Sequence, residues 1–480
     1  MANSFDNFIA GEWINGESYL ENRSPSDTSD LIGLYAQASR KHLETAVQAA
    51  REAAKLTRDI PLESRQNALA QIGRELVSRA GELGTLLSRE EGKPIAEGQA
   101  EVKRAGQFFD YYAAEVLRQE GIAIDSVRPG VEIEARHEPM GVVAVISPWN
   151  FPAATASWKI APALAFGNAV IWKPASQTPA TAHALAEIIS RAGLPAGAFQ
   201  LLMGSGGEIG DALASHAGVN AISFTGSVAT GRRIAAAAAQ NLTRIQLELG
   251  SKNAVLVADD ADLSLALEAC LAGAYSGSGQ KCTASSRILV DRAVHDEFVA
   301  RLAERVAALR VGHALDKDTQ VGPVVSAGQL AANLAWMEKI RASAAKVLCG
   351  GDALSLKHDG HYMSPALVAE SRNDMDFNRE ELFAPIAAVQ KTDSYEEGLA
   401  VVNDTDTGLV AAIFTASLAR ARHFQRHAET GCVSVNLPTA GTDYHVPFGG
   451  RKNSSLGARE QGRAAVQFYT QTKTTYSRAG

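Results

Sequence analysis

The chain has 480 residues, with 46 basic and 53 acidic side chains and a formal net charge of −7. Charged residues make up 21% and hydrophobic residues 46%, which is typical of a globular protein and excludes a disordered one. Without an excess of positive charge to neutralise phosphates, nucleic acid is not expected as a partner. At ~100–200 residues per domain, the length allows two to four domains.

No stretch of about 20 uninterrupted apolar residues predicts a membrane span, because Lys159, Pro162 and Asn168 interrupt the candidate at residues 153–172. No basic residue precedes Arg23, so neither a signal peptide nor a transit peptide is expected. The cysteines form no C-x-x-C pair, which disfavours a zinc site and any other metal site built on them. A reducing, cytoplasmic setting fits four isolated cysteines, at positions 270, 282, 349 and 432.

The first ~35 residues favour short strands separated by turns. Apolar side chains then recur at helical spacing from His42 to Arg89, and a further helix is predicted from Ile95 to about Arg118. Isoleucine and valine alternate around an Arg-Pro-Gly turn at residues 122–133, which predicts a β-hairpin.

From residue 141 the sequence alternates between short apolar runs and helical segments. This alternation predicts an α/β fold, with a mostly parallel sheet covered by helices on both faces. Strands are predicted at 142–146, 169–172, 199–203, 221–224 and 253–257, and helices at 181–191 and 231–240. The final run, 467–476, alternates and is rich in Thr and Tyr, so it predicts a strand without a local partner.

Two side chains suit a nucleophile and a base. Cys282 follows Ser-Gly-Gln-Lys, where glycine lets the backbone approach a ligand and Lys281 would favour a thiolate if its charge points inward. The alternative for any cysteine is an inert buried thiol. Glu248 lies between two leucines, so we expect it to be desolvated with a raised pKa, as suits a general base. A structural ion pair is the alternative for Glu248.

Polar groups follow several predicted strands. Lys173 ends one strand, at the edge where open α/β sheets bind nucleotides, although a solvated loop lysine is the alternative. Gly226 and Ser227 lead into a helix whose N-terminus suits a diphosphate, or simply form a connecting turn. Asn150, in Pro-Trp-Asn-Phe-Pro, offers an amide donor for an oxyanion or a cap for a turn.

Seven blocks, in order along nearly the whole chain, resemble the aldehyde dehydrogenase superfamily. They lie at 148–152, 173–175, 224–227, 248–250, 279–282, 381–383 and 447–450, and the spacing from Glu248 to Cys282, 282 − 248 = 34, also fits. The resemblance implies an aldehyde dehydrogenase fold with three parts. These are a Rossmann-like dinucleotide-binding domain (1–120 and 140–250), an α/β catalytic domain (251–449) and a small oligomerisation element (121–139 and 466–479).

The resemblance also implies roles for individual residues. Cys282 would attack the aldehyde to form a thiohemiacetal, and Asn150 with the backbone N–H of Cys282 would hold the oxyanion. Hydride would pass to NAD or NADP, and Glu248 would activate the water that hydrolyses the resulting thioester. Contacts to the cofactor are implied for Ser147, Pro148, Trp149, Lys173, Ser176, Gly226, Ser227, Glu381 and Phe383.

Three residues depart from the family pattern. Ser251 stands where many members have a second glycine, and Ala384 stands where many have a glycine. Ser176 stands where NAD-preferring members often carry glutamate, which repels a 2′-phosphate. Because Ser176 removes this repulsion and Lys173 could pair with the phosphate, NADP is expected to be accepted.

The substrate is expected to be a short aldehyde that bears a carboxylate. Segments 22–30, 279–287 and 436–447 resemble bacterial semialdehyde dehydrogenases of sugar-acid catabolism, which makes α-ketoglutaric semialdehyde the first choice. Succinate semialdehyde is the alternative, from the resemblance of residues 173–179. Those enzymes typically hold the carboxylate with two arginines, where this chain has Trp158 and Ser276. The anchor stays open among Arg104, Lys281 and the loop 439–445.

Two other functions compete with this interpretation. A coenzyme-A-acylating relative would not need Glu248 to activate water, so the presence of that residue argues against it. A catalytically silent structural or binding protein on the same fold is disfavoured because Cys282, Glu248 and Asn150 are all present. Homodimers or homotetramers are implied, because the terminal strand pairs across subunits in this family.

Overall fold

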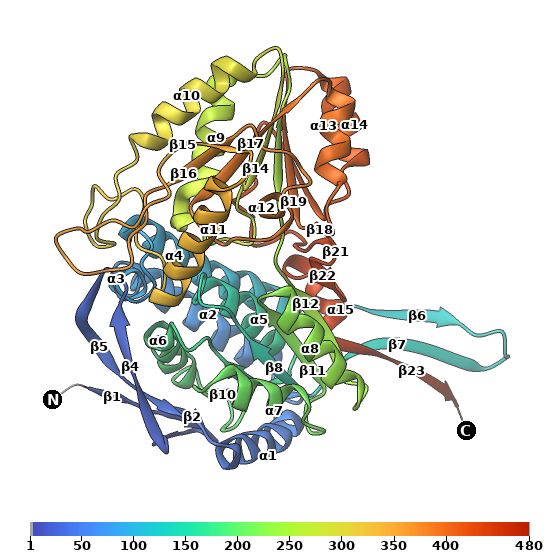
Figure 1. Cartoon of the computed structure of the whole chain (residues 1–480). Helices are drawn as coiled ribbons and strands as arrows, with labels where there is room; N and C mark the ends of the chain where they lie inside the picture. Colours follow the sequence, from blue (N-terminus) through green and yellow to red (C-terminus); the bar gives the residue numbers. More distant parts are fainter. Residues whose placement is uncertain (1–2, 480) are drawn as a thin grey trace.

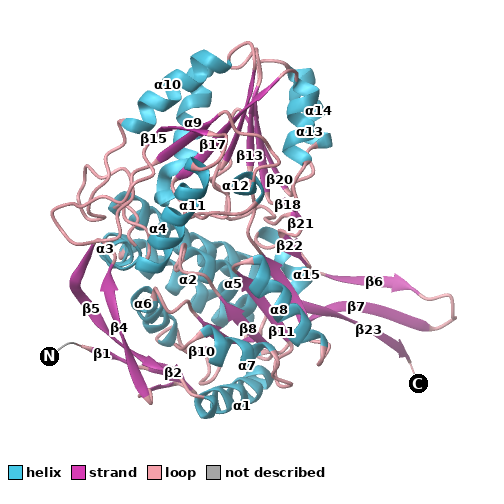
Figure 2. Ribbon diagram, viewed as in Figure 1, coloured by secondary structure: helices cyan, strands magenta, loops and turns pink. Residues whose placement is uncertain are grey.

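Two large β-sheets organise the chain, whose computed structural model describes residues 3–479 (Figure 1). The eight-stranded sheet lies in the lower part of Figure 1, and the seven-stranded sheet lies in the upper part. Helices flank both sheets, and a narrow three-stranded arm extends away from the body (Figure 2).

The eight-stranded sheet has a parallel centre with antiparallel edges. The parallel strands, in spatial order, are β12 (Arg244–Glu248), β11 (Ala221–Thr225), β8 (Val142–Ile146), β9 (Ala169–Lys173) and β10 (Phe199–Leu201). The antiparallel strands are β22 (Ser455–Leu456) at one edge and β2 (Asn7–Ile9) and β3 (Glu12–Ile14) at the other. The strands predicted at 142–146, 169–172, 199–203 and 221–224 are confirmed to within two residues.

The strand order of this sheet reverses between β8 and β11. From β8 the chain moves to β9 and β10 on one side, and then returns to place β11 and β12 on the other side. The loops that leave β8 and β11 therefore diverge at the carboxyl edge of the sheet. Open α/β sheets bind their ligands in the crevice at such a reversal.

Helices bury both faces of the sheet, which explains why β8 reads as one apolar run. Val143 and Val145 pack on one face, while Val142, Ala144 and Ile146 pack on the other. The first face is covered by α2 (Leu62–Ser78), α3 (Ala80–Glu91), α4 (Ile95–Glu115), α5 (Ala154–Ala165) and α6 (Pro179–Ser190). The second is covered by α1 (Arg40–Thr57), α7 (Asp211–Ala214) and α8 (Val228–Ala239).

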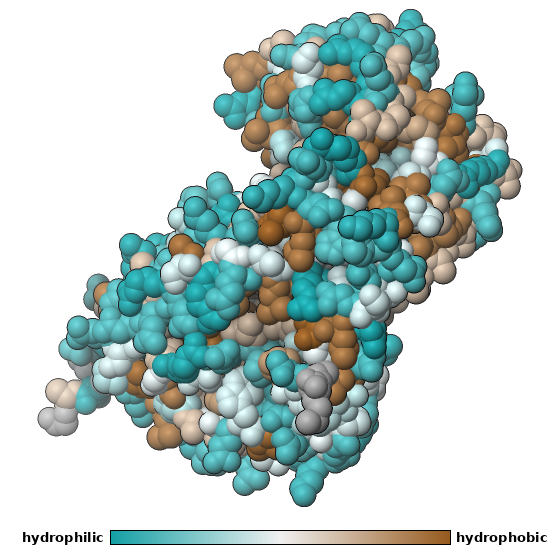
Figure 3. All heavy atoms as spheres, turned by 90° about the vertical axis from the view of Figure 1, so that its left-hand side faces the viewer, coloured by the Kyte–Doolittle hydropathy of each residue, from teal (hydrophilic) through white to brown (hydrophobic). Residues whose placement is uncertain are grey.

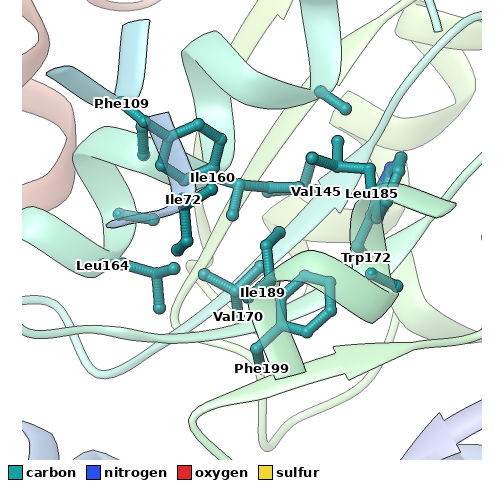
Figure 4. Close-up of a cluster of buried hydrophobic side chains, with 14 of the residues drawn as sticks. Ile72, Phe109, Val145, Ile160, Leu164, Val170, Trp172, Leu185, Ile189 and Phe199 are labelled. Carbon is teal, nitrogen blue, oxygen red and sulfur yellow. The ribbon is translucent and has the colours of Figure 1, made fainter. Parts of the chain in front are cut away.

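Figure 4 shows the core on the first face. Side chains from the helices meet side chains from β8, β9 and β10, and Trp172 of β9 is fully buried among them. The helices contribute Ile72, Phe109, Ile160, Leu164, Leu185 and Ile189, and the strands contribute Val145, Val170, Trp172 and Phe199. This core fixes α4 and α5 against the sheet, and both helices lie beside the site described below.

The seven-stranded sheet is parallel except for one edge strand. Its order is β15 (Lys346–Cys349), β16 (Ala366–Ala369), β17 (Ile386–Thr392), β14 (Arg287–Asp291), β13 (Ala254–Val257), β19 (Val410–Phe414) and β20 (Cys432–Val435), with β15 antiparallel. One face packs against α9 (Leu263–Tyr275) and α10 (His295–Ala307), and the other against α13 (Tyr395–Asn403) and α14 (Leu418–His427). The strand predicted at 253–257 is β13.

The remaining elements are short or peripheral. They are β1 (Ser4–Phe5), β4 (Ser18–Ser24), β5 (Asp27–Gln37), α11 (Ala327–Arg341), α12 (Asp376–Arg379), β18 (Thr407–Gly408) and β21 (Arg451–Lys452), with single turns at 116–118, 206–210, 276–279 and 462–465. The predicted helices at 42–89, 95–118, 181–191 and 231–240 correspond to α1–α3, to α4 with its terminal turn, to α6 and to α8.

The arm contains β6 (Gly121–Asp125), β7 (Val131–Pro139) and β23 (Thr470–Arg478), with β7 in the middle. The hairpin and the terminal strand are confirmed, and β23 pairs antiparallel with β7 along its whole length. The predicted start of that strand is wrong, because residues 466–469 form the helical turn α15 (Val466–Tyr469). This turn directs both Phe468 and Tyr469 into the core, whereas a strand would point them to opposite faces.

Hydrophobic and hydrophilic residues are interspersed on the face shown in Figure 3. Within residues 3–479, none of the helices has the length and apolar character needed to span a bilayer.

Candidate active site

A cavity of about 320 Å³ lies where the strand order of the eight-stranded sheet reverses. The segments that follow β8, β11 and β12 supply one wall, including Asn150, Gly226 and Glu248. The part of the chain that carries the seven-stranded sheet supplies the opposite wall, with Cys282, Gln329, Glu381, Phe383 and Leu409. Phe151, Trp158 and Phe448 make much of the remaining surface apolar.

Cys282 lies in the turn between the 276–279 helical turn and β14. The side-chain amide of Asn253 donates to the carbonyl oxygens of Cys282 over 2.7 Å and Ala284 over 3.1 Å, which fixes this turn. Gly279 has φ +67° and approaches Ala384 so closely that a Cβ would lie 2.1 Å from the Ala384 carbonyl oxygen. The turn that leads to Cys282 therefore has a backbone that only a glycine permits.

The charge of Lys281 does not point toward the thiol. Its ammonium donates to the Ala272 carbonyl oxygen over 3.1 Å and to the Ser276 hydroxyl over 2.5 Å. Burial, with the nearby carboxylates Glu381 and Glu248, raises the pKa of the Cys282 thiol to about 12. The lysine is directed to another part of its own loop, so its charge lowers the pKa of Cys282 less than burial and the two carboxylates raise it.

Asn150 is buried, and its side-chain amide donates to the Gln280 carbonyl oxygen over 2.9 Å. An amide nitrogen carries two hydrogens, so one N–H is left for a ligand in the cavity. Lys93 holds the backbone from behind, because its ammonium donates to the Asn150 carbonyl oxygen over 2.6 Å and lies 4.1 Å from the Phe151 ring centre. Glu101 neutralises Lys93 at 2.6 Å.

Glu248 ends β12 and is only 3% exposed. Its Oε2 accepts from the Ser455 hydroxyl over 2.7 Å, whereas Oε1 has no hydrogen-bond partner among residues 3–479. Burial and the neighbouring Glu460 raise the pKa of Glu248 well above its usual range. Glu460 is itself paired with the buried Lys159. The desolvated carboxyl group predicted for Glu248 is therefore present, with one oxygen free to act on a ligand.

Glu381 and Phe383 reach the cavity from the loop before β17. Glu381 accepts from the Ser251 backbone N–H over 3.1 Å, and burial raises its pKa to about 7. A Cβ on Gly250 would lie 1.9 Å from Glu381 Oε2, so this glycine makes room for the carboxyl group. Phe383 packs its ring edge-on to Trp149, with the ring centres 5.4 Å apart.

The two departures at Ser251 and Ala384 leave this geometry intact. The Ser251 hydroxyl accepts from the Leu409 backbone N–H over 3.2 Å, so the side chain connects the loop after β12 to the loop before β19. The methyl group of Ala384 is buried.

Lys173, Ser176 and Ser147 lie at the same sheet edge but do not line the cavity. The Lys173 ammonium donates to the Pro174 carbonyl oxygen over 2.8 Å, and burial lowers its pKa to about 8. The Ser176 hydroxyl donates to the Gly204 carbonyl oxygen over 3.2 Å. Ser147 accepts from the Trp172 indole N–H over 2.8 Å, which gives it a role in packing.

Gly226 and Ser227 line the cavity at the start of α8. The Gly226 N–H donates to the Glu248 carbonyl oxygen over 3.1 Å, so it is not free for a phosphate. Ser227 caps α8 by accepting from the Thr230 N–H over 3.3 Å. The other first-turn N–H groups and the positive end of the α8 dipole remain available to an anion.

The family model for the "aldehyde dehydrogenase family" matches residues 13–475. The chain belongs to the aldehyde dehydrogenase family. It is therefore an NAD(P)-dependent aldehyde oxidoreductase, and the family membership predicted from the seven sequence blocks is confirmed.

Two curated relatives match this chain over almost its full length. One is the "alpha-ketoglutaric semialdehyde dehydrogenase" of Bacillus subtilis (strain 168), which is 39% identical and covers 99% of this chain and 98% of its own. Another is the "2,5-dioxopentanoate dehydrogenase" of Saccharolobus solfataricus, which is 36% identical and covers 98% of each chain.

The aldehyde dehydrogenase fold is also confirmed by comparison with solved structures. The betaine aldehyde dehydrogenase of Staphylococcus aureus, in complex with NAD+, superposes with a TM-score of 0.96 at 32% sequence identity. The match covers 98% of this chain and 95% of that chain.

Several residues of this site were missed by sequence reasoning. Asn253 carried a usable signal, because it lies only three residues after the Glu-Leu-Gly block. Lys93, Ser455 and Gln329 lie far along the chain from the residues that they support, so only the fold reveals them.

Proposed function

We propose that this enzyme oxidises α-ketoglutaric semialdehyde to 2-oxoglutarate, with Cys282 as nucleophile, Asn150 as oxyanion donor and Glu248 as general base. The observation that carries the proposal is that all three side chains line one cavity, although they come from opposite walls. Each also has the chemical state that its role needs. The relevant groups are a free cysteine that reacts after losing its proton, an amide with one unassigned N–H, and a desolvated carboxyl group with one free oxygen.

The steps follow from these groups. The Cys282 thiol gives its proton to solvent water, and its sulfur then attacks the aldehyde carbon. The oxygen of that carbon becomes negative while it accepts from Asn150 and the Cys282 backbone N–H. After oxidation the carbon is bound to sulfur as a thioester. Glu248 takes a proton from water, which attacks the thioester, releases the acid and restores the thiol.

The cofactor NAD or NADP, when bound, accepts the hydride from the aldehyde carbon. The residues fit such a group, because the first turn of α8 offers N–H groups to an anion and Gly250 leaves room beside Glu381. Pro148, Trp149 and Phe383 would enclose the nicotinamide, and Glu381 would accept from its ribose. Ser147, Lys173 and Ser176 would lie nearer the adenosine end, with Gly226 and Ser227 beside the diphosphate.

The choice of substrate is supported by the names of the relatives, which specify α-ketoglutaric semialdehyde or 2,5-dioxopentanoate. Succinate semialdehyde remains the second candidate. Trp158 and Ser276 stand where succinate semialdehyde enzymes typically have arginine, which favours the first choice.

The proposal includes three parts of the chain. Residues 1–120 and 140–250 would form the dinucleotide-binding domain, residues 251–449 the catalytic domain, and residues 121–139 and 466–479 the element that joins subunits. A homodimer or homotetramer is supported by the exposed side chains of Ile122, Ile124 and Tyr476 on the arm. Four free cysteines support a reducing, cytoplasmic setting.

The test measures NAD(P)H absorbance with α-ketoglutaric semialdehyde, succinate semialdehyde, glutarate semialdehyde and pentanal. We expect the highest kcat/KM for α-ketoglutaric semialdehyde, and no turnover by Cys282→Ala although that variant still binds the cofactor. Preference for succinate semialdehyde would select the second candidate. Equal rates on pentanal, or turnover by Cys282→Ala, would overturn the proposal.

A further inference from the structure

Arg104 is a half-buried arginine on α4 whose guanidinium has no assigned partner. It lies over the Tyr444 ring at 5.4 Å from the ring centre. It forms neither a hydrogen bond nor an ion pair with any residue between 3 and 479. By contrast, two arginines at α3 have carboxylate partners. Arg79, just before the helix, pairs with Glu75, and Arg89, within it, pairs with Asp30. Among the described residues, the five N–H donors of Arg104 therefore have no acceptor, and its nearest named contact is the Tyr444 ring.

Arg104 lies next to the aromatic wall of the active-site cavity. Phe108, one helical turn further along α4, packs edge-on to Trp158 with ring centres 5.8 Å apart, and Trp158 lines the cavity with Cys282. Tyr444 packs edge-on to the other side of this wall, 6.5 Å from the Phe108 ring centre. Because residues four apart on a helix are neighbours, Arg104 and Phe108 lie on the same side of α4, and both contact Tyr444.

The loop that carries Tyr444 is fixed to the nucleophile segment. The Thr439 hydroxyl donates to the carbonyl oxygen of Thr283, the residue after Cys282, over 2.7 Å. The same hydroxyl lies 2.7 Å from the Ser285 hydroxyl. Arg104 therefore lies on a helix, and the loop that carries Tyr444 is fixed at Thr439 to the segment that follows Cys282.

The other cations around the cavity already have partners. Lys281 donates to Ala272 and Ser276, Lys93 to Glu101 and Asn150, and Lys159 to Glu460. Within the described residues, these lysines lie buried beneath the wall, whereas the guanidinium of Arg104 is partly exposed.

We propose that Arg104, stacked on Tyr444, binds the carboxylate at the far end of the substrate and so selects aldehydes that carry one. This inference rests on the proposed function, and it names the anchor that the sequence left open. A guanidinium held flat against a ring presents its N–H edge to an anion, and two parallel N–H groups match the two oxygens of a carboxylate. The ring also reduces the conformational freedom that the arginine loses on binding.

The test compares kcat/KM for α-ketoglutaric semialdehyde with that for pentanal, an uncharged aldehyde of equal length. We expect Arg104→Met to lower the value for the charged substrate by ~10²-fold, mainly through KM, because a hydrogen bond to a charged group is lost. Pentanal should change by less than about threefold, since it makes no such bond. Arg104→Lys keeps the charge but not the two parallel N–H donors, so its kcat/KM for the charged substrate should fall by an intermediate factor.

Lys103→Met is the matched control, because it removes the adjacent cation of α4, which points to solvent. We expect it to leave both substrates unchanged. Binding of glutarate to Cys282→Ala, measured by calorimetry with NAD bound, provides a second readout and should weaken when Arg104→Met is added.

The outcomes separate this inference from the function that it rests on. A wild-type enzyme that does not prefer the charged aldehyde over pentanal would overturn the proposed substrate and the anchor together. A wild-type preference that survives in Arg104→Met, or a loss equal for both aldehydes, would overturn the anchor alone and leave the proposed substrate standing.

Discussion

The ammonium group of Lys93 donates a hydrogen bond to the backbone carbonyl oxygen of Asn150 over 2.6 Å. The lysine is 3% exposed and its charge is balanced by Glu101, so the contact is rigid and shielded from water. An oxyanion donor acts only from the right position, and Lys93 fixes the backbone from which the Asn150 side chain extends.

We expect Lys93→Met to lower kcat by about tenfold or more, because Asn150 loses this support. The variant should also lose about 3–5 kcal/mol of stability, since Glu101 becomes a buried charge without its partner. Adding Glu101→Gln removes that charge, so thermal unfolding should recover while kcat stays low. If the double variant recovered both its thermal stability and its kcat, Lys93 would have only a structural role. Lys93→Arg keeps the positive charge and should restore part of the rate.

Replacement of Glu248 should separate the two halves of the reaction. In Glu248→Gln the amide cannot take a proton from water, but the attack of Cys282 does not need this group. We expect a rapid burst of NAD(P)H followed by turnover at least about 10²-fold slower than wild type. Stopped-flow absorbance checks this, and a wild-type steady state would remove Glu248 from its assigned role.

The pKa of Cys282 gives a pH dependence for the enzyme without cofactor. Because that pKa is raised to about 12, the thiolate fraction should still be rising at pH values where an ordinary thiol is already ionised. Alkylation by iodoacetamide, followed by mass spectrometry of the Cys282 peptide, should therefore accelerate up to at least about pH 10, with free cysteine levelling off near ~8.5 as the reference. If the alkylation rate of Cys282 levelled off at a lower pH than that of free cysteine, the raised pKa of Cys282 would be contradicted.

Ser176 should influence the choice between NAD and NADP. We expect the wild type to accept NADP, and Ser176→Glu to shift the ratio of kcat/KM toward NAD by about tenfold or more, because a carboxylate repels the 2′-phosphate. Gln177→Glu adds the same charge at the adjacent exposed position and serves as the control. Strong discrimination against NADP by the wild type would show that Ser176 does not set the preference.

The strands that position the site could be predicted because their apolar runs are buried on both faces, as in β8 and β9. The start of the terminal strand could not, since aromatic residues such as Phe468 and Tyr469 are common in strands and only the core shows that both point inward. Short apolar segments allow both interpretations, and tertiary packing decides between them.

The cavity residues could be predicted one by one from sequence motifs, but the residues that hold them in position could not. Adjacency in sequence suggested that Lys281 would favour the thiolate of Cys282. Its charge does lower the pKa of that thiol, but burial and the nearby carboxylates outweigh it, because the ammonium is directed to acceptors such as Ser276 that the fold brings near. Lys93 and Asn150 are 57 positions apart, so no local pattern connects them.

The hydrogen bond from Asn150 to Gln280 joins the two walls of the cavity. The same side chain therefore holds the two walls together and carries the oxyanion role proposed above. A chain whose halves have not yet docked, such as one still being synthesised, would have its thiol but would lack this donor in place, so the proposed catalytic arrangement would form only when folding is complete.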